Sequence, residues 1–222
     1  MDVVRLVERY LDDSRAAGRI ACEPRLIPAP GQYLLAHALG SDSPLPVSVF
    51  SAGTDADGFL AAPPLPAAWT PGASLLLRGP LGRGFTMPPS ARRVALAVLD
   101  AAPSRLLGLI PLASAQGAAI VLVSDSPPES LPLAVEVQPR KALAEILAWA
   151  DYLAADVERD SLGGLLDTFG RNPKRPSGSQ LLVHAPMPCG GIAECGVCAV
   201  HSSRGWKMAC RDGPVFDLDE LK

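Results

Sequence analysis

Four of the five cysteines in this chain lie between positions 189 and 210. They are Cys189, Cys195, Cys198 and Cys210, in the spacing C-x5-C-x2-C-x11-C. Glycines at positions 190, 191 and 196 allow the backbone to wrap closely around a small centre and to direct N–H groups at sulfur. Four thiolates in so short a segment predict a metal centre with these cysteines as its ligands.

Two kinds of metal centre fit four cysteines. Plant-type [2Fe–2S] centres use C-x4-C-x2-C and a more distant fourth cysteine, and the present run has one extra residue in its first gap. Zinc ribbons usually carry two short C-x2-C pairs, whereas only Cys195 and Cys198 form such a pair here. The spacing favours a [2Fe–2S] cluster, and a structural zinc site stays open as the alternative.

The overall composition excludes several classes of function. The 222 residues include 20 basic and 23 acidic side chains, so there is no basic surplus of the kind that binds nucleic acid. No apolar run is long enough for a membrane span, and the first ten residues mix charged with apolar side chains, so we expect no signal peptide. We therefore predict a cytoplasmic protein, because clustered cysteines in a reducing compartment bind metal more often than they form disulfides.

An amphipathic helix is predicted near the N-terminus. Asp2 is a suitable N-cap, apolar residues follow at helical spacing, and Gly18 is a suitable end. The apolar face consists of Val3, Leu6, Val7, Tyr10 and Leu11.

Between about residues 19 and 85 the pattern changes to short apolar runs separated by Pro and Gly. This spacing is typical of a small antiparallel β-barrel or sandwich. The stretch ends in a glycine-rich turn, Gly79–Phe85. The apolar runs lie at 25–27, 32–36, 47–50, 58–60 and 74–77.

The region from Ala91 to about Ser177 alternates buried strands with helices, which predicts a doubly wound α/β layer with a parallel sheet. Strands are expected at 94–99, 118–123, 133–137 and 181–183. Helices are expected over 103–115 and from about 139, the second with an apolar face that reaches Val157. The polar stretch 171–179 is the best linker candidate.

Together these patterns predict a multi-domain α+β chain. Residues 1–88 would form the N-terminal helix and an antiparallel β-barrel. Residues 89–178 would form the α/β parallel-sheet layer, and residues 179–222 a small C-terminal [2Fe–2S] module.

Three stretches carry a resemblance to a known family. Pro30–Tyr33 is similar to a PGQ-aromatic motif, Gly79–Phe85 to GPLGxGF, and Cys189–Phe216 to a cluster module that closes with C-x-DGPVF. In this order they resemble the iron–sulfur electron-transfer subunit of two-subunit dihydroorotate dehydrogenases, within the ferredoxin–NADP reductase superfamily. The resemblance implies a [2Fe–2S] cluster on the four cysteines and a flavin site that includes Ser48, Gly79 and Gly82.

The sequence departs from this family at both nucleotide sites. Leu45 stands where the family's Arg-Pro-x-Ser strand has the arginine that meets the flavin pyrophosphate, and leucine has no donor. Asp100-Ala101-Ala102-Pro103 stands where the family has a glycine-rich turn for the nicotinamide dinucleotide. We therefore expect that the chain alone binds neither FAD nor NAD(P)H tightly, with Arg78 and Arg83 as the cations available to replace the missing arginine at the flavin site.

Two functions of different classes follow. The first is electron transfer, in which the chain relays electrons between a flavin-containing oxidoreductase subunit, or another redox protein, and a further carrier. The chain is then a subunit of an oxidoreductase complex rather than an enzyme by itself. The second is a non-catalytic assembly or regulatory subunit on a reductase scaffold, with a structural four-cysteine metal site. No catalytic residue is predicted, because the sequence shows no nucleophile–base constellation and no carboxylates paired for acid–base work.

Overall fold

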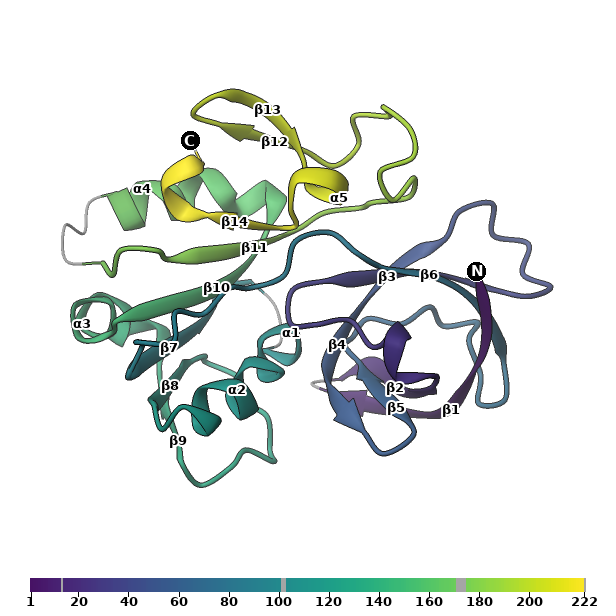
Figure 1. The fold of residues 1–222 in the computed structure, drawn as a ribbon, viewed down its shortest axis with the longest axis horizontal. Helices are drawn as coiled ribbons and strands as arrows, with labels where there is room; N and C mark the ends of the chain where they lie inside the picture. Colours follow the sequence, from purple (N-terminus) through teal and green to yellow (C-terminus); the bar gives the residue numbers. More distant parts are fainter. Residues whose placement is uncertain (13, 101–102, 171–174, 222) are drawn as a thin grey trace.

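The computed structural model describes residues 1–12, 14–100, 103–170 and 175–221. It contains a β-barrel, an α/β layer and a C-terminal segment that lies over both (Figure 1). The predicted multi-domain α+β fold class is confirmed. Within the described residues, no helix has the length and apolar character needed to cross a membrane.

The barrel is built from the first six strands. They close in the order β1-β2-β5-β4-β3-β6, and every neighbouring pair is antiparallel. The apolar side chains that point inwards, among them Leu6, Leu34 and Phe59, form a barrel core. The strands are β1 (Asp2–Asp12), β2 (Arg15–Ala21), β3 (Tyr33–Ala38), β4 (Val47–Asp55), β5 (Gly58–Ala61) and β6 (Ser74–Leu81), with a short helical turn η1 (Pro24–Leu26).

The helix predicted over residues 2–11 is wrong, because these residues form strand β1. Val4 and Leu6 are buried, whereas Val3 and Val7 are exposed, so the apolar pattern that matters has period two. β-branched valines also favour a strand over a helix. Pairing with both β2 and β6 closes the barrel, and Gly18 lies within β2 rather than ending a helix.

The α/β layer is a sheet of six strands within the described residues, in the order β14-β11-β10-β7-β8-β9. All neighbouring pairs are parallel except β11 and β14. The strands are β7 (Arg93–Val98), β8 (Ala119–Val123), β9 (Val135–Gln138), β10 (Tyr152–Glu158), β11 (Gln180–His184) and β14 (Val215–Asp217). The helices are α1 (Ser104–Leu107), α2 (Leu109–Ala115), α3 (Leu143–Trp149) and α4 (Leu162–Gly170), with short turns η2 (Arg140–Ala142), η3 (Arg159–Ser161) and η4 (Leu218–Glu220).

The long helix predicted from residue 139 to Val157 is wrong in its second half. Helix α3 ends at Trp149, and Leu153, Ala154 and Val157 belong to the inner strand β10. A strand buried on both faces has a continuous apolar run, which periodicity cannot distinguish from a buried helix. The structure also contains α4, which the sequence pattern did not predict.

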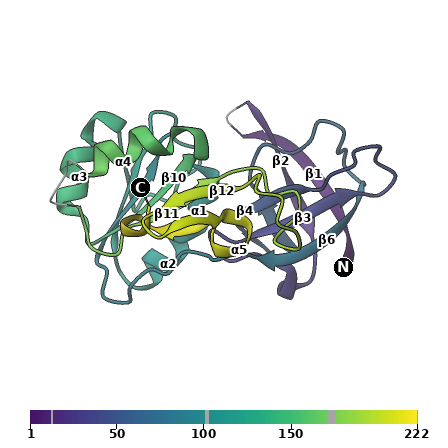
Figure 2. The same ribbon diagram turned by 90° about the horizontal axis from the view of Figure 1, so that it is seen from above.

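The C-terminal segment packs on both of the other parts. It contains a hairpin of β12 (Ala199–Ser202) and β13 (Gly205–Met208), the helical turn α5 (Ala209–Asp212) and the edge strand β14. Seen from above, its yellow ribbon extends from the sheet towards the barrel (Figure 2). Its buried Cys210 and Phe216 share one apolar cluster with Tyr33 and Phe50 of the barrel.

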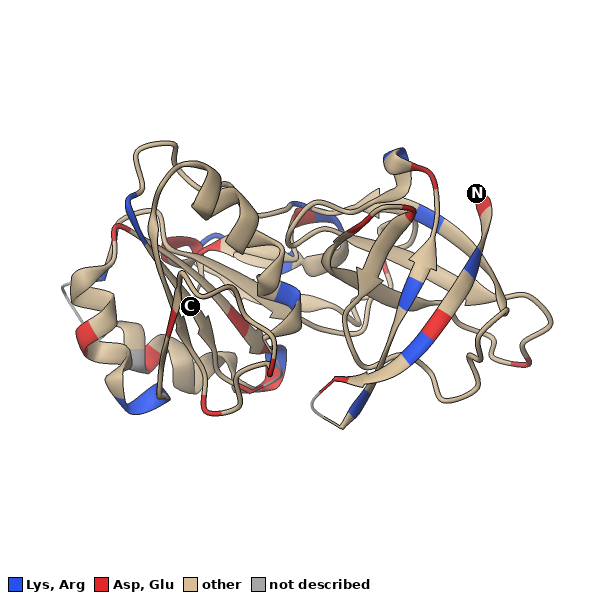
Figure 3. Ribbon diagram, turned by 90° about the horizontal axis from the view of Figure 1, so that it is seen from below, with Lys and Arg blue, Asp and Glu red and all other residues tan. Residues whose placement is uncertain are grey.

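The predicted boundaries at 88 and 178 stay predictions. Strand β11 follows the second boundary and is part of the six-stranded sheet, as is β14. Residues 171–174 of the predicted linker lie outside the described residues. Side chains of both charge signs occur in the barrel and in the α/β layer (Figure 3).

Candidate metal centre

The four predicted cysteine ligands lie together on the C-terminal segment. Cys189 and Cys195 are on a loop, with their sulfur atoms 3.6 Å apart. Cys210 lies in α5 and its backbone N–H donates to the sulfur of Cys198 at 3.4 Å. Cys198 and Cys210 are buried, Cys189 is half-buried and Cys195 is exposed.

Side-chain interactions connect all four cysteines. The side chain of Cys189 interacts with those of Cys195 and Cys210, and Cys210 in turn interacts with Cys198. The described residues contain no group of three or more His, Cys, Asp or Glu side chains arranged to hold one metal ion.

The backbone around the cysteines explains how the loop and the later Cys210 are brought together. The amide of Ala209 donates to the carbonyl of Cys198 at 3.0 Å, which joins β13 and α5 to the end of the ligand loop. Gly190 has a φ of +52°, in the left-handed region that side chains rarely adopt. The loop therefore reverses direction directly after its first cysteine.

The thiols at the two ends of the segment have opposite pKa shifts. Burial, followed by the hydrogen bonds and charges of the neighbouring Cys198 and Cys189, raises the pKa of Cys210 to about 12. Burial also acts to raise the pKa of Cys189, but hydrogen bonds with the backbone of Gly191 and Ala193 and with the side chains of Cys195 and Cys210 together outweigh it and lower the pKa. Four crowded thiols with backbone donors fit a cationic, thiophilic centre, because such a metal stabilises the thiolates that burial and mutual repulsion disfavour.

Two arginines connect the cysteine loop to the rest of the molecule. Arg78 of β6 donates from Nη2 to the carbonyl oxygens of Cys189 at 3.1 Å and Gly190 at 2.6 Å. Arg159, from the turn after β10, donates to the carbonyl of Val197. The loop is thus held from the barrel on one side and from the α/β layer on the other.

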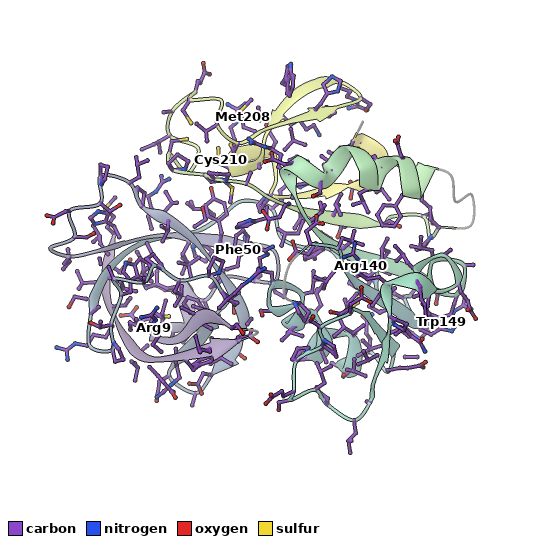
Figure 4. All side chains as sticks on the ribbon, turned by 180° about the vertical axis from the view of Figure 1, so that it is seen from behind. Arg9, Phe50, Arg140, Trp149, Met208 and Cys210 are labelled. Carbon is purple, nitrogen blue, oxygen red and sulfur yellow. The ribbon has the colours of Figure 1, made fainter. Side chains whose placement is uncertain are left out.

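A cavity of about 640 Å³ opens between the barrel, the sheet and the cysteine loop. Phe50 lies on its barrel side, near the centre of the molecule (Figure 4). Ser48, the first of the three predicted flavin residues, lines this cavity, and so does Leu45. The other polar residues that line it are Arg105, Glu158, Arg159, Asp160 and His184.

The other two predicted flavin residues, Gly79 and Gly82, do not belong to the cavity lining. A Cβ on Gly82 would lie 2.6 Å from Pro214 Cδ and 2.7 Å from the carbonyl of Gly213. The amide of Arg83 donates to that same carbonyl at 2.5 Å. The glycine-rich turn therefore packs against the DGPVF segment and joins the barrel to the cysteine module.

A buried ion network forms one wall of the cavity. Arg105 donates to both oxygens of Asp156, at 2.7 and 3.1 Å, and to Glu158 at 3.2 Å. Glu158 also lies 2.8 Å from Nδ1 of His184. Burial acts to raise the pKa of Glu158, but the hydrogen bonds and charges of His184 and Arg105 lower it overall.

An aromatic row links this wall to the cysteines. The ring centroids of His184 and Phe50 are 5.8 Å apart, and those of Phe50 and Tyr33 are 6.0 Å apart. The hydroxyl of Tyr33 donates to the carbonyl of Cys210 at 3.0 Å. The cavity and the cysteine site are therefore in direct packing contact.

The predicted departure at the nicotinamide turn falls partly outside the described residues, which lack Ala101 and Ala102. Beside this turn, Asp100 and Asp125 line a cavity of about 400 Å³ with Arg140. Helix α1 packs between β4 of the barrel and β10 of the sheet (Figure 1). It brings Arg105 into the region between the two layers.

The residues that sequence reasoning missed are the arginines Arg105 and Arg159 and the carboxylates Asp156 and Glu158. One feature of the sequence could have pointed to Arg105. Arg105 opens the helix after the first strand of the α/β layer, at the carboxyl end of the strands where such sheets bind ligands. The pairing of Arg105 with the end of β10 depends on sheet order, which no local pattern encodes.

A family model matches the segment that carries the four cysteines. Residues 185–222 match the family model of the iron–sulfur cluster binding domain of dihydroorotate dehydrogenase B. No curated protein matches the chain.

Among solved structures, the NADH-dependent reduced ferredoxin-NADP oxidoreductase, from work on flavin-based electron bifurcation, aligns with a TM-score of 0.77. The identity is 17%, over 100% of this chain and 90% of that chain. A ferredoxin reductase in carbazole 1,9a-dioxygenase aligns with a TM-score of 0.63 and 14% identity, over 77% of this chain and 65% of that chain. The Amycolatopsis cytochrome P450 reductase GcoB aligns with a TM-score of 0.59 and 13% identity, over 78% of this chain and 66% of that chain.

These likenesses show a ferredoxin reductase-like fold for the chain. The resemblance stated from the sequence is confirmed for the cysteine segment by the family match, and the fold of the chain agrees with it. The C-terminal segment is thus supported as an iron–sulfur cluster binding domain.

Proposed function

We propose that this chain carries one [2Fe–2S] cluster on Cys189, Cys195, Cys198 and Cys210 and relays single electrons between a partner oxidoreductase and another carrier. The observation that carries the proposal is the grouping of the four interacting cysteines within the segment that matches a cluster-binding family. In a [2Fe–2S] centre each iron takes two protein ligands. Two neighbouring pairs are in contact here: the sulfur atoms of Cys195 and Cys189 are 3.6 Å apart, and the amide of Cys210 donates to the sulfur of Cys198 at 3.4 Å.

The chain's own residues bind and shield this centre. When bound, the cluster supplies reversible one-electron chemistry. Buried Cys198 and Cys210 hold its inner side, and the exposed Cys195 marks the side nearest to solvent and to a docking partner. No side chain has to transfer a proton. A cytoplasmic location is part of this proposal, because the thiols must stay reduced until metal is bound.

Metal analysis tests the cluster directly. Protein purified without oxygen is expected to contain about two iron and two acid-labile sulfide per chain, with visible absorption that bleaches on reduction. The measurement is iron, zinc and sulfide content on one sample. One equivalent of zinc without sulfide would contradict the proposal and favour the alternative, an assembly or regulatory subunit with a structural four-cysteine site.

We further propose that the chain by itself binds FAD weakly. Leu45 is 56% exposed at the cavity and offers no donor to a pyrophosphate. Arg105 is already paired with two carboxylates. Arg159 is paired with Asp160 and also donates to the carbonyl of Val197.

The two arginines considered as replacements for the missing flavin arginine are also engaged elsewhere. Arg78 donates to the cysteine loop, and Arg83 lies 4.0 Å from Asp217. Neither lines the cavity.

Release of cofactor by denaturation tests this expectation, with far less than one equivalent of flavin fluorescence expected from the native protein. The substitution Leu45→Arg is expected to raise FAD affinity roughly ten- to a hundredfold, because one charged hydrogen bond contributes about 1.5–3 kcal/mol. Leu39→Arg is the matched control, since Leu39 is similarly exposed on the barrel but does not line the cavity. Near one equivalent of flavin in the native protein would show that the flavin site is intact.

We also propose that the chain by itself does not bind NAD(P)H tightly. A dinucleotide pyrophosphate carries two negative charges and needs cations or backbone N–H donors at the carboxyl edge of the sheet. Asp100 and Asp125 lie at that edge, and Arg140 there is 3.9 Å from Asp125. A chain that binds neither nucleotide tightly must exchange electrons with other proteins, so we propose an obligate subunit with a redox partner.

A further inference from the structure

Arg78 approaches the cysteine loop from the barrel, 111 residues earlier in the sequence than Cys189. It lies within β6, directly before Gly79, the first residue of the glycine-rich stretch. Its guanidinium donates from one nitrogen to two consecutive carbonyl groups, those of Cys189 and Gly190. Because two consecutive carbonyl oxygens accept hydrogen bonds from one guanidinium, the conformation of the loop here depends on the positive charge of Arg78.

The cysteine loop has a glycine, Gly190, at the position that faces Arg78. A Cβ on Gly190 would be 2.1 Å from Arg78 Nη2 and 2.5 Å from Leu35 Cδ1. The positive φ of Gly190 allows its carbonyl to turn towards the guanidinium. Arg78 and Leu35 therefore pack closely against Gly190, which lies in the five-residue gap between the first two cysteines.

No carboxylate neutralises this arginine among the ion pairs of the described residues. Arg105, by contrast, has two carboxylate partners. The guanidinium is half-buried, so water screens its charge less than it would on an open surface. A fixed and unpaired positive charge thus lies against the first cysteine.

The strand next to that of Arg78 contacts the last cysteine. Strand β3 pairs with β6, and it carries Tyr33. The hydroxyl of Tyr33 donates to the carbonyl of Cys210 at 3.0 Å. The two adjacent strands therefore hold the first and the last cysteine, β6 through Arg78 and β3 through Tyr33.

We propose that Arg78 is a positioning residue that raises the reduction potential of the cluster, an inference that rests on the proposed function. One-electron reduction, with the electron supplied by a reduced carrier of the partner protein, makes the four-cysteine site one unit more negative, and no bond forms or breaks. A nearby cation stabilises the more negative form, and charge and hydrogen bonding are among the factors that set such potentials. The positive charge at position 78 thus favours acceptance of an electron from the partner.

The test compares reduction potentials, measured by dye-coupled titration of the loaded protein, for the native chain and Arg78→Gln. We expect the equilibrium constant for reduction to fall about tenfold, a potential lower by about 59 mV. Arg78→Lys keeps the charge and is expected to stay near the native value. The matched control is Arg9→Gln, because Arg9 is a half-buried barrel arginine that donates to the carbonyl of Ala67 and lies far from Cys210 (Figure 4).

Iron and sulfide content separates this inference from the proposed function. If the native protein holds no cluster, the proposed function fails before any variant is compared. Equal potentials in fully loaded native protein and Arg78→Gln would overturn the role of Arg78 alone. If Arg78→Gln takes up no iron, the Arg78→Lys variant decides. Iron uptake by Arg78→Lys supports a requirement for the positive charge. If Arg78→Lys also takes up no iron, Arg78 has a packing role only and the proposal is overturned.

Discussion

Replacement of Cys198 by serine is expected to abolish the cluster and to make the segment after residue 179 sensitive to protease, while earlier residues stay protected. Cys198 is 1% exposed, and its carbonyl and sulfur accept hydrogen bonds from the amides of Ala209 and Cys210. The short segment that matches the cluster-binding family, residues 185–222, has little apolar core of its own. Metal binding must therefore supply much of the free energy that orders this loop.

Limited proteolysis followed by mass spectrometry checks this expectation, together with the loss of iron and sulfide. Cys22→Ser is the matched control, because Cys22 is a half-buried thiol that packs against the barrel core, remote from the metal centre. It should leave both the cluster and the cleavage pattern unchanged. Uniform digestion of the Cys198→Ser chain would show that the cluster stabilises the whole fold rather than one segment.

The substitution Asp156→Ala is expected to lower the free energy of unfolding by about 3–5 kcal/mol. The side chains of Arg105 and Asp156 are only 3% and 0% exposed, and two hydrogen bonds connect them. Removal of the carboxylate leaves Arg105 buried with Glu158 as its remaining partner, and Glu158 also binds His184. A buried charge that loses its partner costs far more than an exposed ion pair contributes.

Urea unfolding followed by circular dichroism measures this effect on protein with its cluster bound. Glu23→Ala removes an exposed partner of Arg25 and should barely move the midpoint. Replacement of both buried partners, in Arg105→Met with Asp156→Leu, should recover much of the stability, because an apolar pair removes the unpaired charge. A midpoint for Asp156→Ala equal to that of Glu23→Ala would show that water or Glu158 already satisfies Arg105.

The features that sequence reasoning predicted are those that short spacing encodes. The spacing of the cysteines predicted four thiols in one place, and in the structure their side chains interact with one another. The alternation of short apolar runs with Pro and Gly predicted the barrel. The strands β7 and β8 were expected within one or two residues of their observed bounds, because each is a buried run flanked by loops.

Features that depend on distant partners were not predicted. Residues 2–11 contain both a helical and an alternating apolar pattern, and only pairing of β1 with β2 and β6 decides between them. Leu153 and Val157 continue the apolar run of α3, and only the parallel neighbours β7 and β11 make them a strand. Arg78 and Arg105 act across more than 50 positions of sequence, at separations of 111 and 51 residues.

The order of strands along the chain also determines when the metal centre can form. Strands β7 to β11 precede Cys189, whereas β14, at the sheet edge, follows Cys210. During synthesis, the ribosome therefore makes the barrel strands and β7 to β11 before it makes the first ligand. At about 5–20 residues per second, the 22 residues from Cys189 to Cys210 take roughly 1–4 s. The sheet can pair its last edge strand, β14, only after all four thiols have been made.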